Sequence, residues 1–179
     1  MSRPDQKSAW IRSAIDRYES QLIRYTQRIT RDLEQARETV QESFLKLWQE
    51  DQSKVEGHLL EWLYTVCRNH ALDLKRKDKR MVPLAGEKMP EVADDSPTAG
   101  EQLERREDEN RVLDAFGSLN EKQQEVLRLK FQGGLSYAEI SRITGLSVSN
   151  VGYIIHTGIQ LIRSRLIPET ALEGVTHER

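Results

Sequence analysis

Apolar residues recur at helical spacing through the first eighty residues of the chain. A first run alternates spacings of four and three residues, which places its members on one helix face: Ile11, Ile15, Tyr18, Leu22, Tyr25 and Ile29. A second run continues the stripe with Leu33, Ala36, Val40, Phe44, Leu47 and Trp48. After a polar stretch, a third run consists of Leu59, Leu60, Leu63, Val66, Cys67 and Leu74. No stretch alternates at period two, so we expect an all-α fold.

The character of the chain changes over residues 81–100. Five proline or glycine residues stand there among acidic ones. Such a segment cannot bury enough apolar surface to offset its ordering entropy. We therefore expect a flexible acidic linker between two small helical domains, of residues 8–80 and 101–167, followed by a polar tail of residues 168–179.

Capping signals predict the helices of the second domain. One helix is predicted to begin where Asn120 is followed by Gln123, and to end at the Gly133–Gly134 pair. Its buried side consists of Val126, Leu127, Leu129 and Phe131. Ser136, followed three residues later by Glu139, forms a capping box that begins the next helix.

Residues 136–157 have the spacing of a helix-turn-helix motif. Ser141 is small where the second helix crosses the first, and Gly145 permits the sharp turn. Ser147 or Ser149 caps the second helix. The pocket between the helices consists of Ile140, Leu146, Val151 and Ile154. The motif predicts that the second helix enters the major groove of DNA, and the alternative is a helical hairpin packed for stability alone.

The outward positions of that second helix are Ser149, Asn150, Gly152, Tyr153, His156 and Thr157. None carries a fixed positive charge, although phosphate contacts usually dominate affinity and arginine is the commonest reader of guanine. Asn150 is suited to adenine, and Tyr153 or His156 to the backbone or a thymine methyl group. Phosphate contacts are expected further along, from Gln160, Arg163 and Arg165. We expect this helix to read DNA weakly on its own.

A cationic cluster ends the first domain. It consists of Arg68, Lys75, Arg76, Lys77, Lys79 and Arg80. Only Asp73 and Asp78 oppose it. Such a cluster favours phosphate binding that depends strongly on salt, and the alternative is a solvated helix end with cations well placed at its C-terminus.

Composition narrows the class of protein. The net charge of −2 requires any nucleic-acid contact to come from a local patch. The single cysteine, Cys67, favours a reducing compartment. Cys67 and His70 have the spacing of two metal ligands, but the further ligands of a zinc site are missing.

The N-terminus has no signal-peptide core and no apolar run would cross a bilayer, so we expect a soluble cytoplasmic protein without membrane contact. We expect no metal, no cofactor and no enzymatic activity, because no motif gathers the groups that these need.

Three blocks of the chain, in order, resemble the extracytoplasmic-function class of sigma factors. Residues 39–49, which read TVQESFLKLWQ, resemble the polymerase-binding helix of that family. Residues 59–80 resemble its segment that reads the minus-10 promoter element, and residues 119–151 resemble its minus-35 binding domain. A short linker in place of a middle domain distinguishes this class from larger sigma factors.

The resemblance implies a mechanism with core RNA polymerase and promoter DNA as partners. The first domain would bind the clamp of the polymerase through Glu38, Gln41, Glu42 and Phe44. It would also capture a flipped minus-10 base, with DNA contacts from Asn69, Asp73, Lys75, Arg76, Lys79 and Arg80. The second domain would hold the minus-35 duplex through Ser149, Asn150, Tyr153, His156 and Thr157. Some subgroups of the family that lack its usual acidic cluster are associated with serine/threonine kinases, so a kinase is a candidate partner, and an anti-sigma factor is another.

The chain departs from the family where an acidic cluster usually precedes the polymerase-binding motif. Residues 35–38 read Gln-Ala-Arg-Glu, which should weaken attraction to a basic polymerase surface. Thr39 and Ser43 lie on the same predicted helix, and a phosphate on either would add a charge of about −1.5 to −2. Our hypothesis is that phosphorylation switches polymerase binding on. The alternative is that Thr39 is a surface threonine and that Glu38 and Glu42 suffice.

Two other functions compete with the sigma-factor interpretation. A stand-alone helix-turn-helix regulator would bind duplex tightly by itself, as a dimer on a palindrome. The uncharged second helix and the block of residues 59–80 argue against it. A regulator that occupies the sigma site without reading promoters fits the weak second helix, but it does not fit the intact minus-10 segment.

Overall fold

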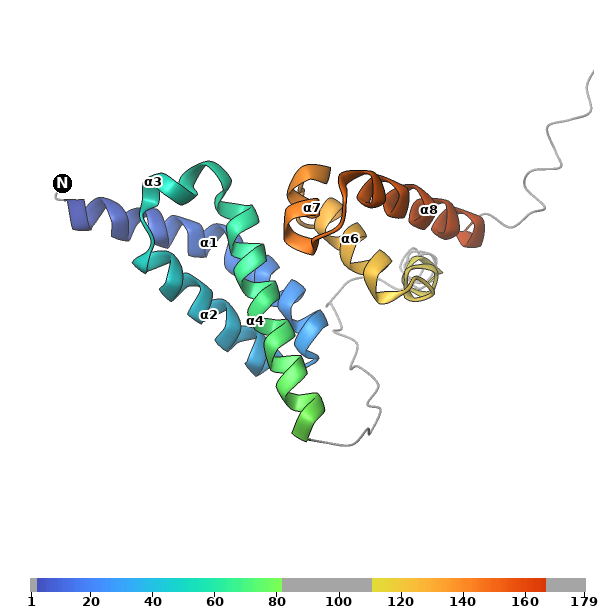
Figure 1. Ribbon diagram of the computed structural model, residues 1–179, viewed down its shortest axis with the longest axis horizontal. Coiled ribbons are helices and arrows are strands. Elements are labelled where there is room, and N and C mark those ends of the chain that lie inside the picture. The colour runs from blue at the N-terminus through green and yellow to red at the C-terminus, as the bar shows by residue number, and fades with distance from the viewer. Residues whose placement is uncertain (1–2, 82–110, 167–179) are drawn as a thin grey trace, which may run out of the picture. The chain divides into compact units, whose positions relative to one another are not determined.

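The computed structural model describes the backbone of residues 3–81 and 111–166, and every described element is a helix (Figure 1). The expected all-α fold is therefore confirmed for this part of the chain. The predicted linker falls outside the described residues apart from Met81, which ends a helix. Residues 101–110 and the predicted tail also lie outside them. No helix in the described ranges is long and apolar enough to span a membrane.

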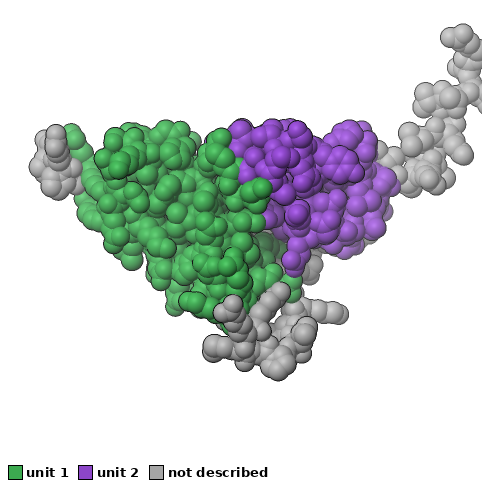
Figure 2. Space-filling view, viewed as in Figure 1, with its two compact units in different colours: residues 1–90, 142–145 green, residues 91–141, 146–179 purple. Residues whose placement is uncertain are grey.

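The chain divides into two compact units, of residues 1–90 with 142–145, and of residues 91–141 with 146–179 (Figure 2). The first contains α1 (Arg3–Thr30), α2 (Leu33–Gln49), the single turn α3 (Gln52–Val55), a 3₁₀ turn (Glu56–His58) and α4 (Leu59–Met81). The helices α1, α2 and α4 pack against one another. Their apolar stripes meet in a core that includes Leu22, Ala36, Val40, Leu47, Leu63, Cys67 and Ala71.

Backbone conformation and side-chain caps determine where the helices of this unit begin and end. Arg31 follows α1 with φ 61°, the left-handed conformation that commonly ends a helix. Asp32 then caps α2, because its carboxylate accepts a hydrogen bond of 3.0 Å from the Gln35 amide. Asp51 caps α3 in the same way, through the Ser53 amide at 3.1 Å. The hydrogen bonds to Ser53 lower the pKa of the Asp51 carboxyl.

The second group of helices consists of α6 (Glu121–Phe131), α7 (Tyr137–Thr144) and α8 (Val148–Leu166), preceded by helical residues 111–117. The predicted capping box of Asn120 and Gln123 is present, with reciprocal hydrogen bonds of 2.9 and 3.1 Å. Gly134 takes a φ of 68° after α6, as the glycine pair predicted. The helices enclose a core that includes Val126, Leu129, Leu135, Ile140 and Val151.

Three side chains that the apolar stripes assigned to the core lie on the surface instead. Leu33 is 38% exposed, Trp48 is 47% exposed and Phe131 is 64% exposed. Leu33 begins α2 and Trp48 is next to Leu47, whose side chain fills the core. Trp48 lies about 100° around α2 from Leu47, on the same side of the helix as the exposed Leu45. Phe131 ends α6, where the chain turns away.

Candidate functional site

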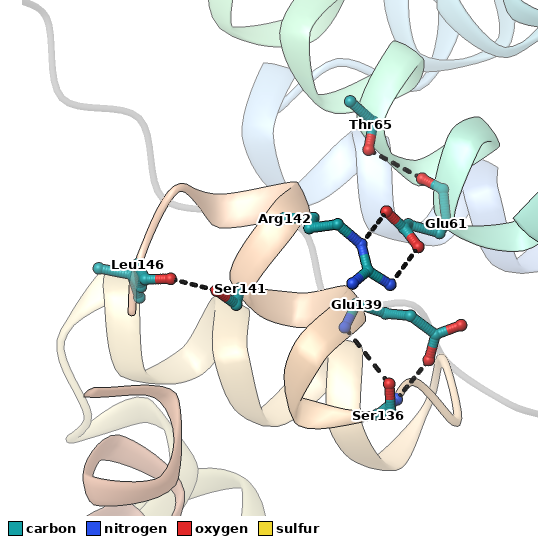
Figure 3. A network of polar contacts seen from close by, with 7 residues as sticks. All are labelled: Glu61, Thr65, Ser136, Glu139, Ser141, Arg142 and Leu146. Atoms are coloured by element: carbon teal, nitrogen blue, oxygen red, sulfur yellow. Dashed lines mark hydrogen bonds and ion pairs between the residues drawn. The ribbon is translucent and has the colours of Figure 1, made fainter. Parts of the chain in front are cut away.

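Side-chain hydrogen bonds fix the start of α7 and the turn of the helix-turn-helix (Figure 3). The Ser136 hydroxyl accepts from the Glu139 amide at 3.3 Å, and the Glu139 carboxylate accepts from the Ser136 amide at 2.7 Å. The Ser141 hydroxyl donates to the Leu146 carbonyl at 2.5 Å. Gly145 has a φ of 74°, the left-handed conformation that glycine adopts without strain. The capping box and the predicted turn are therefore both confirmed.

The pocket of the motif orients α8. Ile140, Val151 and Ile154 are buried, as predicted, and Leu146 is half-buried. Of the two candidate caps it is Ser147 that begins α8, because its hydroxyl accepts from the Asn150 amide at 3.2 Å. The buried inner face of α8 thus leaves its opposite face directed outward.

The outward face of α8 is polar and open. Ser149, Asn150 and His156 are exposed, and Tyr153 is 68% exposed. Thr157 is half-buried, and its hydroxyl donates to the Tyr153 carbonyl at 2.9 Å. No lysine, arginine or acidic residue occurs between Ser147 and Gln160, and the exposed Arg163 and Arg165 follow only in the last turns. The surface is therefore polar but has little charge for phosphate.

Gly152 has a neighbour that sequence reasoning did not assign to this face. A Cβ atom added there would lie 3.6 Å from Cε2 of Tyr137, an ordinary contact. The Tyr137 side chain is 40% exposed. It comes from the start of α7, so this ring and the outward face of α8 are adjacent. The spacing of apolar residues predicts each helix but not the geometry of the turn between α7 and α8. The contact between Tyr137 and α8 could therefore not be predicted from the sequence.

Three of the candidate minus-10 residues share one face of α4. Asn69, Asp73 and Arg76 are exposed and are separated by four and three residues. Arg76 lies 3.2 Å from the Asp73 carboxylate, so part of its charge is satisfied within the helix. Lys75 is half-buried. The side chains of Lys79 and Arg80 lie outside the part that the structure describes, although their backbone belongs to α4.

The candidate polymerase-binding residues of α2 divide between its two faces. Glu38, Gln41 and Glu42 are exposed. Phe44 is only 6% exposed and packs in the core, so it can support the helix but is not available to a partner. Glu42 lies with one carboxylate oxygen 3.3 Å from Nδ1 of His70 on α4. Three of the four predicted residues therefore remain accessible.

Thr39 and Ser43 are not surface residues. Both are fully buried, at 0% and 1% exposure, between α2 and the rest of the bundle. The Ser43 hydroxyl donates to the Thr39 carbonyl at 2.8 Å and accepts from the Cys67 thiol at 3.2 Å. The Thr39 hydroxyl has no hydrogen-bond partner in the described structure. A kinase cannot reach either hydroxyl in this fold, which corrects the picture of an accessible threonine on α2.

Cys67 is the buried thiol that its place on the apolar face predicted. Burial in the apolar core raises its pKa to about 11, so the thiol is neutral and a poor nucleophile or metal ligand. Within residues 3–81 and 111–166, the structure gathers no three histidine, cysteine, aspartate or glutamate side chains that would hold a metal ion.

Comparison with known proteins matches both helical groups to one family. Residues 14–81 match the family model of sigma-70 region 2, and residues 109–161 match that of sigma-70 region 4. The SigK sigma factor of Mycobacterium ulcerans is 30% identical over 133 residues, which cover 69% of this chain and 68% of that protein. The SigL sigma factor of Mycobacterium tuberculosis is 26% identical over 162 residues, which cover 89% of this chain and 90% of that protein.

A third relative is longer than this chain. The probable RNA polymerase sigma factor RfaY of Xanthomonas campestris is 30% identical over 144 residues, which cover 78% of this chain but only 36% of that protein. The two region models, their order along the chain and the match to SigK over two thirds of its length agree on one assignment. The chain belongs to the extracytoplasmic-function sigma factors, which recognise promoters together with RNA polymerase.

Proposed function

We propose that this sigma factor reads DNA only as part of the polymerase holoenzyme, with the outward face of α8 placed on the minus-35 duplex. The observation that carries the proposal is the composition of that face. Tyr153, His156 and Asn150 are exposed, yet no fixed cation accompanies them before Arg163. Because cation–phosphate contacts supply most of the affinity of an isolated DNA-binding domain, this helix needs a partner to hold it on DNA. A stand-alone regulator would need the opposite composition.

The exposed face of α4 is proposed to bind the nontemplate strand of the minus-10 element. An asparagine amide such as that of Asn69 can pair with the edge of an unstacked base, and nearby cations can follow the backbone. Binding of the extruded base would shift the duplex toward the open form without any chemistry by the protein. In this division of labour, residues 8–80 are region 2 and residues 101–167 are region 4.

The outward face of α2 is proposed to bind core polymerase through Glu38, Gln41 and Glu42. These side chains are exposed on a helix that is otherwise anchored on α1 and α4. Phosphorylation of Thr39 or Ser43 stays a hypothesis. The burial of both hydroxyls means that α2 would first have to move away from its neighbours, so modification cannot be a simple addition of surface charge. Control by an anti-sigma factor is likewise a proposal that rests on the family.

The proposal is tested by fluorescence anisotropy on a labelled fragment of the gene's own upstream region. We expect no stable complex of the chain alone at roughly physiological salt, and a specific complex when core polymerase is added. Asn69→Ala should weaken the holoenzyme complex by roughly tenfold or more, the usual value of a base contact. Arg12→Ala, which changes an exposed residue of α1, should leave it unaltered. Tight binding of the chain alone to a palindrome would instead establish the stand-alone regulator.

A further inference from the structure

Several arginine side chains of α1 project from one narrow strip of its surface. Arg17, Arg24 and Arg28 are separated by seven and four residues, which places them within about 40° of one another around the helix axis. All three are exposed, and we call them the α1 arginine stripe. The acidic residues of the helix lie at least about 80° outside this strip, and they are Asp5, Asp16 and Glu19. No acidic residue of α1 therefore opposes the stripe.

The stripe adjoins the side of α4 that packs against α1. The Tyr25 ring of α1 meets the Tyr64 ring of α4 edge-on, with the ring centroids 4.9 Å apart. Burial raises the pKa of Tyr64 to about 12, and the charge of Arg24 opposes that rise, so this guanidinium lies near the Tyr64 hydroxyl. Arg68 and Lys75 follow Tyr64 at spacings of four and seven residues, so they project from the same side of α4. The two helices thus contribute to one basic surface.

The composition and length of this surface suit a phosphate backbone. Arg17 and Arg28 are eleven residues apart, or about 16 Å along α1, which equals the rise of about five phosphates on one DNA strand. A guanidinium matches phosphate geometry through paired N–H donors. Like charges four residues apart destabilise a helix, so stability alone does not account for Arg24 and Arg28. Arg68 is next to Asn69 in the chain, so the basic surface borders the proposed minus-10 face of α4.

We propose that the α1 arginine stripe binds the sugar–phosphate backbone of promoter DNA beside the minus-10 element. The inference rests on the proposed function, because it requires the promoter complex. It adds a phosphate-binding surface on α1, a helix to which no contact with DNA has been assigned. The stripe supplies, from the first unit, the fixed cations that the outward face of α8 lacks between Ser147 and Gln160.

The test measures the binding of holoenzyme to a labelled fragment of the gene's own upstream region at several salt concentrations. Each phosphate contact contributes about 0.9 to the slope of log K against log salt concentration. Arg17→Gln and Arg24→Gln should each lower that slope by about this amount and weaken binding roughly fivefold at about 0.15 M salt. Arg24→Lys should keep the slope, since the charge remains. The preference for the minus-10 sequence should not change, because phosphate contacts carry no sequence information.

The matched control is Arg12→Gln, which removes an exposed arginine of α1 that lies about 140° around the helix from Arg17. It should bind promoter DNA as the unaltered chain does. All variants should match the parent in circular dichroism melts and in affinity for core polymerase alone, because the altered side chains are exposed.

Three outcomes would contradict the inference. An unchanged affinity and slope in Arg17→Gln and Arg24→Gln, together with weaker binding by Asn69→Ala, would overturn this inference alone. Loss of affinity for core polymerase itself in the stripe variants would identify the stripe as a protein contact and overturn the inference too. Absence of a promoter complex with the unaltered chain would overturn the proposed function and this inference with it.

Discussion

Replacement of Thr39 by glutamate tests whether Thr39 is a buried core residue or an accessible site of regulation. The Thr39 side chain is fully buried and its hydroxyl has no hydrogen-bond partner in the described structure. A carboxylate at this position would be larger than the space it enters and would lose its hydration without gaining a partner. Overpacking a core costs about 1–3 kcal/mol, and an uncompensated buried charge costs about 3–5 kcal/mol. The variant should therefore be severely destabilised.

Thermal unfolding followed by circular dichroism measures this cost. For a helical unit of this size, 1 kcal/mol corresponds to a shift of about 4–8 °C in Tm, so Thr39→Glu should lower the Tm by at least about 15 °C at pH 7. Burial raises the folded-state pKa of the introduced carboxyl above its unfolded value. The folded state then binds protons preferentially. The difference in Tm between the variant and the parent should therefore shrink as the pH falls through that raised pKa.

Two further substitutions serve as controls. Thr39→Val keeps the shape and removes a hydroxyl without a partner, so it should leave the Tm unchanged or raise it by an amount equivalent to about 1 kcal/mol. Gln41→Glu adds the same negative charge on the exposed face of α2 and should leave the Tm unaltered. The reasoning is refuted if Thr39→Glu melts like the parent and binds core polymerase more tightly. That outcome would support the phosphorylation hypothesis instead.

The same structure predicts three other results. Gly145→Ala should cost about 1–2 kcal/mol in the stability of the helix-turn-helix because its φ is 74°, whereas Gly117→Ala, with open space and no such constraint, should be near neutral in the same melt. Gly152→Arg, whose Cβ would make only an ordinary contact with Tyr137, should tighten binding of holoenzyme to minus-35 DNA and steepen its salt dependence by about one phosphate contact. Cys67, with its pKa raised to about 11 by burial, should react with iodoacetamide at pH 8 only on unfolding, so fast labelling of native protein would contradict the buried core.

Local signals predicted the parts of this fold that depend on a few neighbouring residues. The capping boxes at Asn120 and Ser136 and the turn at Gly145 are read from residue types at fixed short spacings, and the structure contains all three. The periodicity of α2 likewise identified the face that Val40 and Leu47 bury.

Side chains at the margins of a helix face were harder to place. Thr39 lies beside the apolar run of α2 and Trp48 is its last member, and only the positions of α1 and α4 decide that the first is buried and the second exposed. Residue type alone predicts the reverse, because threonine is mostly exposed in proteins and tryptophan is mostly buried. The same limit applies to Leu45, which is 64% exposed.

The central claim is that this chain directs transcription from promoters only with core polymerase. Abortive initiation on the gene's own upstream region tests it most directly. The reactions contain the unmodified chain with core polymerase, or either one alone. The account predicts short transcripts only when both are present, and their loss with Asn69→Ala. Stable binding of the chain to core polymerase without any transcripts, on that fragment and on a library of promoter sequences, would contradict it and favour a regulator that occupies the sigma site.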